Sequence, residues 1–190
     1  KRGSMYITGG TKSGKSKFVE ELAKKKKKRV YVATSIPFDN EMKNRVKRHK
    51  EQRGKDWLTV ESYRNIDTVL LDINGIKDVE VILLDCLTNM VTNIMIMEKE
   101  IDWDNISEIE LKEVEREVLS EVEKVISLSK KLSCDIIIVS NEVGMGLVPE
   151  YPLGRHFRDI AGQMNQVIAK EAVEGYLIVS GMALRIKWVS

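Results

Sequence analysis

The sequence predicts a single α/β domain in which a mainly parallel sheet carries helices on both faces. Short apolar runs alternate with helix-like segments along the chain, as they do when crossover helices connect parallel strands. The runs at residues 81–86 and 135–140 are continuously apolar, which is typical of central strands buried on both faces. With 190 residues, no internal repeat and no second apolar core, the chain suits one domain.

The elements expected in the N-terminal half follow from apolar periodicity and from one capping residue. Phe18, Leu22 and Ala23 lie on one face of a helix. Asp39 is placed to cap a second helix. The expected order is a strand at 5–8, a helix at 16–25, a strand at 30–34, a helix at 39–52, a strand at 58–61 and a helix at 66–71.

The C-terminal half alternates between buried strands and long helices. Apolar residues recur near helical spacing in residues 105–131, behind an outer face of Glu and Lys, which predicts an amphipathic helix. The expected order is a strand at 81–86, a helix at 105–131, a strand at 135–140, a helix at 153–174, a strand at 176–180 and an edge strand at 184–187. Residues 1–4 resemble a cloning scar before Met5, so we expect residues 5–190 to form the domain.

The composition is that of an ordinary soluble protein, and we expect it to be cytoplasmic. Hydrophobic residues are 43% and charged residues 32% of the chain, and no apolar run approaches the ~18 residues that a membrane helix needs. A net charge of +2 gives no electrostatic argument for a nucleic-acid or membrane partner, and we expect neither. The two cysteines, Cys86 and Cys134, are interpreted as reduced core thiols rather than as a disulfide or metal site.

Residues 24–29 form a run of six positive charges after the first expected helix. Cations are favourable at the C-terminus of a helix, so the run is interpreted as a solvated helix end. The alternative is a patch that binds nucleic acid.

A phosphate-binding loop follows the first expected strand directly. Its sequence fits G-x-x-x-x-G-K-S and comprises Gly9, Gly10, Thr11, Lys12, Ser13, Gly14, Lys15 and Ser16. Glycines let several backbone N–H groups point at one anion, and the following helix presents its positive N-terminus. We expect Lys15 to reach the β- and γ-phosphates of ATP or GTP and Ser16 to bind Mg²⁺. Asp85, at the end of a buried apolar run, is the candidate second metal ligand. Together these features predict a P-loop NTPase-like fold.

A histidine lies within a strongly basic helix. Arg45, His49 and Arg53 are spaced by four residues and therefore share one helix face. Neighbouring cations disfavour a protonated imidazole, so His49 is expected to be neutral and nucleophilic near pH 7. The alternative is a surface histidine on a solvated helix.

A second polar patch follows the expected strand at 135–140. Glu142 is a candidate for orienting a hydroxyl or a water, and Arg155 and Arg158 are candidates for a lid over phosphates. The alternative is a polar loop followed by a solvated helix start.

The motifs together resemble those of the bifunctional adenosylcobinamide kinase / adenosylcobinamide-phosphate guanylyltransferases of cobalamin biosynthesis. The resemblance extends over residues 6–187. It is carried by GGTKSGKS, YVATS, EMKNRVKRHKEQRGKDW, LLDCLTNMVTN, SNEVGMGLVPEYPLGRHFRDIAGQMNQ and VSG.

The resemblance implies roles for individual residues. A histidine at position 49 would take GMP from GTP as a phosphoramidate; some members have two adjacent histidines, where this chain has Arg48 and His49. Family members often have Arg at the position of Lys12. The implied nucleotide contacts are the loop from Gly9 to Ser16 together with Thr34, Ser35, Ile36, Lys50, Glu51, Gln52, Arg53, Glu61 and Asp85.

The implied enzyme phosphorylates adenosylcobinamide with ATP or GTP and Mg²⁺. It then transfers GMP from GTP to adenosylcobinamide phosphate, giving adenosylcobinamide-GDP. The resemblance also implies a homotrimer with sites near subunit boundaries. The apolar segment 87–97 is interpreted either as part of the subunit interface or as core of a single chain. The alternatives are a P-loop kinase of another small molecule without guanylyltransferase activity, and a non-enzymatic nucleotide switch.

Overall fold

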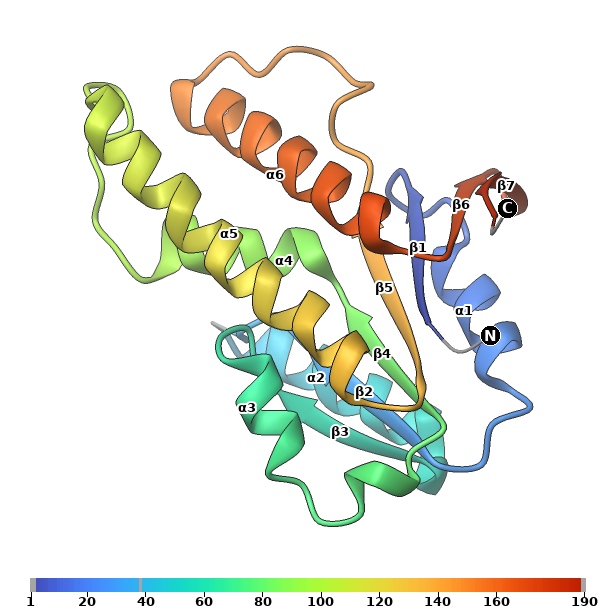
Figure 1. Ribbon diagram of the computed structural model, residues 1–190. Coiled ribbons are helices and arrows are strands. Elements are labelled where there is room, and N and C mark those ends of the chain that lie inside the picture. Colours follow the sequence, from blue (N-terminus) through green and yellow to red (C-terminus); the bar gives the residue numbers. More distant parts are fainter. Residues whose placement is uncertain (1–2, 38, 189–190) are drawn as a thin grey trace.

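The computed structural model describes residues 3–37 and 39–188, which form a seven-stranded sheet of order β3-β2-β4-β5-β1-β6-β7 (Figure 1). Neighbouring strands are parallel, except that β7 runs antiparallel to β6. The strands are β1 (Ser4–Gly9), β2 (Arg29–Ala33), β3 (Trp57–Glu61), β4 (Val81–Asp85), β5 (Asp135–Asn141), β6 (Glu174–Val179) and β7 (Met182–Lys187). The predicted α/β fold class is therefore confirmed.

Six α-helices lie in the described part of the chain, with two short 3₁₀ turns and one π-helical turn. The α-helices are α1 (Lys15–Ala23), α2 (Asn40–Arg53), α3 (Ile66–Leu71), α4 (Leu87–Thr92), α5 (Glu108–Lys131) and α6 (Pro152–Glu171). The 3₁₀ turns are Gly54–Asp56 and Ile76–Asp78, and the π-helical turn is Asn93–Met97. Among the described residues, no helix has the length and apolar character that crossing a membrane requires.

Two apolar cores cover the two faces of the sheet, as the fold class predicts. Helices α3 to α6 pack on one face, where α5 and α6 lie side by side (Figure 1). On the other face, Val19 and Ala23 of α1 pack against Ile7, Val139 and Ile178 of the strands. This two-sided burial explains why the strand sequences are almost continuously apolar.

Several predicted boundaries were wrong, and each correction has a local cause. Strand β1 begins at Ser4 rather than at Met5, because Ser4 pairs with Ile136 of β5. Helix α5 begins later than predicted, because Ser107 and Glu110 form a reciprocal capping box. Helix α6 ends at Glu171, because Glu174 already belongs to β6.

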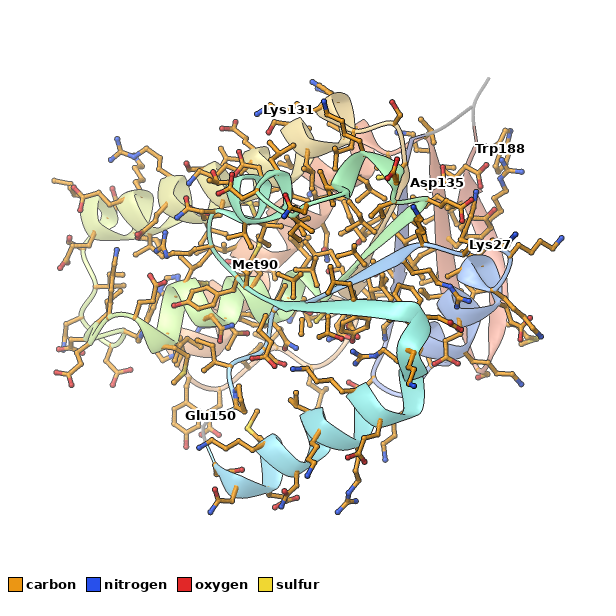
Figure 2. The ribbon with its side chains drawn as sticks, turned by 90° about the horizontal axis from the view of Figure 1, so that it is seen from below. Lys27, Met90, Lys131, Asp135, Glu150 and Trp188 are labelled. Carbon is orange, nitrogen blue, oxygen red and sulfur yellow. The ribbon has the colours of Figure 1, made fainter. Side chains whose placement is uncertain are left out.

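The apolar segment after Asp85 forms α4 and the π-helical turn, neither of which was predicted. Met90, Val91, Ile94 and Met95 are at most 1% exposed, so these residues are core within one chain. Figure 2 shows Met90 in the interior of the molecule. The segment reaches the surface at Asn89 and at its end, where Met97 is 43% exposed.

The basic run is a turn rather than a helix end, because α1 stops at Ala23. Lys26 pairs with Asp135 at 3.2 Å, and the Glu80 carboxylate accepts bonds from the backbone N–H groups of Lys27 and Lys28. Figure 2 shows Lys27 at the margin of the molecule. The local acids and solvent therefore account for the run.

An ion cluster ties the segment after β3 to α5. The Arg64 guanidinium donates to the Glu98 carboxylate, to Glu117 at 2.7 Å and to the buried Glu121 at 3.5 Å. The hydrogen bonds from Arg64 lower the pKa of Glu98. Burial opposes ionisation of Glu117, but bonds from Lys99 and Arg64 outweigh it and lower its pKa.

Replacing Arg64 by alanine is expected to lower the free energy of unfolding by about 2–3 kcal/mol at pH 7, because a buried carboxylate loses a partner. A carboxylate whose pKa is lowered in the folded protein stabilises the fold fully at pH values above its ordinary pKa of 4.5. That stabilisation is lost as the pH falls through the lowered pKa of the folded state. The difference between variant and wild type should therefore shrink below pH 4.5. Urea unfolding at pH 7 and below pH 4.5 measures the free energy of unfolding, with the exposed Arg116→Ala as the control. Equal losses of stability in the two variants would contradict the prediction.

Candidate active site

The predicted phosphate loop is a compact turn between β1 and α1. Gly14 has φ 104° and Lys12 has φ 54°, so the chain passes twice through the left-handed region. The Ser13 N–H donates to the Gly10 carbonyl at 3.3 Å, and the Ser13 carbonyl accepts from Gly181 N–H at 2.7 Å. The turn between β6 and β7 therefore supports the loop from one side.

The Lys15 side chain lies inside this loop. Its ammonium donates to the carbonyls of Gly9 at 3.0 Å and Gly10 at 2.6 Å. Burial lowers the pKa of Lys15, and the negative charge of Asp85 opposes that shift. The ammonium is thus held at the start of α1, where a phosphate group would be drawn by the helix N-terminus.

Asp85 ends β4 and faces β2. The hydroxyl of Tyr31 donates to its carboxylate, and burial together with Asp85 raises the pKa of Tyr31. The Arg53 guanidinium lies 3.2 Å from the centroid of the Tyr31 ring, a cation–π contact. Tyr31 therefore connects the candidate metal ligand to the end of α2. Sequence analysis missed Tyr31 because its strand read only as an apolar run.

A cavity of about 450 Å³ opens between α1, α2 and the sheet. It brings together four predicted site residues, Ser16, Ser35, Arg53 and Asp85. Its wall also includes residues that the sequence did not single out, namely Glu20, Tyr31, Met42, Val46, Trp57, Thr59 and Asn89. The volume falls in the range of small-ligand pockets.

The residues in this cavity fit Mg²⁺ bound together with nucleotide phosphates. In the part of the chain described, no group of three His, Cys, Asp or Glu side chains is placed to hold a metal alone. Mg²⁺ commonly takes one or two protein ligands and completes its shell with phosphates and water. The Ser16 hydroxyl and the Asp85 carboxylate, which line the same cavity, match that requirement.

A second cavity of about 330 Å³ adjoins the first, sharing Ala33 and Ser35 with it. The predicted residues Thr34, Ser35, Ile36 and Glu61 line it. The Thr34 hydroxyl fixes this wall, since it accepts from Cys86 N–H at 2.8 Å and donates to the Cys86 carbonyl at 2.7 Å. Burial raises the pKa of the Cys86 thiol, and Cys86 and Cys134 are buried outside any disulfide.

The remaining predicted contacts lie on α2 and on the rim of the loop. Lys50 pairs with Glu61 at 2.9 Å, beside the second cavity. Glu51, Thr11 and Lys12 are exposed and line neither cavity. His49 lies one turn before Arg53 in α2, whose predicted cap is confirmed by the bond from Met42 N–H to the Asp39 carboxylate at 2.7 Å. The side chains of Arg45, His49 and Gln52 lie outside the described residues.

The C-terminal patch is arranged differently from the predicted lid. The Arg158 guanidinium donates to the Gly144 carbonyl at 2.7 Å, and Arg155 donates to the carbonyls of Pro149 at 3.1 Å and Glu150 at 2.6 Å. Both arginines therefore hold the preceding loop rather than closing over phosphates. The ring of His156 lies 6.1 Å from that of Trp103, away from both cavities.

Replacing Gly9 by alanine is expected to weaken ATP binding by tenfold or more. A methyl group there would lie 2.5 Å from the Ile178 carbonyl oxygen and 2.6 Å from the Ser13 hydroxyl, so the loop must shift. Such overpacking costs about 1–3 kcal/mol. Calorimetric titration with MgATP measures the change. Gly10→Ala is the matched control, because a methyl group there meets nothing within 4 Å. Equal affinities for the two variants would refute the packing argument.

Comparison with known proteins identifies the family of this chain. Residues 5–186 match the family described as cobinamide kinase / cobinamide phosphate guanyltransferase. The bifunctional adenosylcobalamin biosynthesis protein CobU of Escherichia coli K12 is 40% identical over 188 residues, covering 96% of this chain and 99% of that protein. CobU of Salmonella typhimurium is 40% identical over 187 residues, with the same coverage. CobP of Pseudomonas aeruginosa is 32% identical over 182 residues and 95% of both chains. The chain therefore belongs to the cobinamide kinase / cobinamide phosphate guanyltransferase family.

Proposed function

We propose that this protein phosphorylates adenosylcobinamide and then transfers GMP from GTP to the resulting phosphate, giving adenosylcobinamide-GDP. The observation that carries the proposal is the cavity that brings Ser16 and Asp85 together beside the phosphate loop. It lies in a chain that matches the bifunctional family over residues 5–186.

In the kinase step, the loop from Gly9 to Ser16 holds the phosphates of ATP or GTP. The oxygen of the acceptor hydroxyl forms a bond to the γ-phosphorus. The bond between that phosphorus and the bridging oxygen breaks, and the nucleoside diphosphate leaves. Lys15, already held inside the loop, neutralises the developing charge on the phosphate oxygens. Bound Mg²⁺, held by Ser16 and Asp85, would add further charge stabilisation.

In the transferase step, His49 acts as the nucleophile. An imidazole nitrogen forms a bond to the α-phosphorus of GTP while the bond from that phosphorus to the bridging oxygen breaks, releasing pyrophosphate. The phosphate of the acceptor then attacks the same phosphorus, the nitrogen–phosphorus bond breaks, and the imidazole is restored. Splitting the displacement in two is the advantage of covalent catalysis. Arg53, which lines the cavity from the same helix, supports this assignment.

The proposal includes a cytoplasmic homotrimer, in keeping with soluble substrates and with the family resemblance. Because Met90, Val91, Ile94 and Met95 are buried within one chain, any subunit contact made by segment 87–97 would involve its exposed positions, Asn89 and Met97. A mass of one chain in light scattering would refute the trimer.

Labelling with radioactive GTP tests the function. With Mg²⁺, the protein should retain acid-labile label from α-³²P GTP but none from γ-³²P GTP, and should pass γ-label to cobinamide. Phosphorylation of cobinamide without retained α-label would leave a kinase that lacks guanylyltransferase activity. GTP binding without either reaction would refute the proposed function.

A further inference from the structure

The loop between β5 and α6 exposes several large apolar side chains. Met145 is 79% exposed, Leu147 96%, Val148 69% and Tyr151 71%. Grouped exposed apolar residues on a soluble domain are typical of a binding surface. Neither catalytic step described above uses them.

Polar contacts hold the backbone of this loop in place. The Glu142 carboxylate accepts from the N–H groups of Gly144 and Met145, the first at 2.5 Å and the second at 3.1 Å. Arg158 and Arg155 bind carbonyls farther along the loop. The apolar side chains are therefore presented outward on an ordered segment, which lowers the entropic cost of binding a ligand.

The loop starts beside the phosphate loop. The Glu142 N–H donates to the Gly9 carbonyl at 2.9 Å, and Asn141 is in register with Gly9 across β5 and β1. Figure 1 shows the loop rising from the end of β5, near the end of β1, and then passing over α6 to the start of that helix. A ligand resting on it can therefore place one end at the transferred phosphate.

The size of the acceptor favours this surface over the cavities. The two cavities measure about 450 and 330 Å³, which suits a nucleotide. Cobinamide is a corrin macrocycle that carries methyl groups as well as polar amide side chains, and its reacting hydroxyl lies at the end of a flexible arm. The acceptor has to lie next to the bound nucleotide, and the exposed β5–α6 loop offers an apolar surface that starts beside the phosphate loop.

We infer that the exposed apolar side chains of the β5–α6 loop bind the corrin macrocycle of the acceptor and thereby direct its hydroxyl, and later its phosphate, toward the bound nucleotide. This inference rests on the proposed function. Leu147 and Val148 are the central contacts, because they are adjacent apolar residues in the middle of the loop and are 96% and 69% exposed. Ordering the macrocycle near the phosphate would contribute to rate by positioning.

A double variant, Leu147→Ser with Val148→Ser, tests the inference. Because both side chains are exposed, the double variant should fold like wild type. The dissociation constant for hydroxocobinamide, measured by equilibrium dialysis, and the KM for cobinamide should both rise by about tenfold. The KM for ATP and the retained label from α-³²P GTP should not change. The control is Ile186→Ser, which removes a 51% exposed apolar residue from the end of β7 remote from its turn.

Three results distinguish the possible failures. An unchanged dissociation constant for hydroxocobinamide in the double variant would overturn the inference. A lower molecular mass of the double variant in light scattering would also overturn it, because the loop would then be a contact between copies of the chain. If wild type neither binds nor phosphorylates cobinamide, the proposed function itself fails.

Discussion

Replacing His49 by alanine is expected to abolish retention of label from α-³²P GTP while leaving cobinamide kinase activity within about threefold of wild type. The imidazole is the proposed covalent carrier of GMP, and α2 contains a single histidine. The kinase step uses the phosphate loop, so its rate does not depend on this side chain. Counting the acid-labile ³²P that stays on the protein at neutral pH measures the transfer of GMP to the protein, and a separate assay with γ-³²P ATP measures the kinase step.

The second histidine provides a matched control. His156 lies against Trp103, outside both cavities, so His156→Ala should retain the label at the wild-type level. Loss of label in both variants, or in His156→Ala alone, would contradict the assignment. Label that survives in His49→Ala would show that another residue carries GMP.

Replacing Lys15 by alanine is expected to lower the kinase kcat by about 100- to 1000-fold, the usual cost of removing one group that stabilises transition-state charge. The side chain is 8% exposed and its ammonium lies within the phosphate loop, so it is already positioned for the γ-phosphate. Steady-state assays at saturating ATP measure the loss. Because the same loop binds GTP, transfer of GMP should fall as well.

Lys17 is the matched control for this change. It lies two residues farther along α1, and its side chain is exposed. Lys17→Ala removes the same charge from the same helix, and its kcat should stay within about twofold of wild type, as expected for a surface position. A similar loss in both variants would mean that general electrostatics, rather than the ammonium inside the loop, determines the rate.

Most of the fold followed from the sequence because its signals are local. The buried strands β4 and β5 read as apolar runs, and Asp39 is a cap that acts within one turn of its own helix. Residues 87–97 do not show a clear amphipathic period, because the polar residues Thr88 and Asn93 are buried together with the apolar ones, so their helical structure was not predicted.

The sequence by itself determined the phosphate loop, since eight consecutive residues carry the motif and β1 and α1 flank it directly. Only the tertiary structure placed Tyr31 on Asp85, a contact between residues 54 positions apart that depends on β2 lying beside β4. Only the tertiary structure turned Arg155 and Arg158 from a predicted lid into supports for a loop. The physical reason is the range of the interactions: a phosphate loop is built from neighbouring residues, whereas a partner across the sheet depends on strand order.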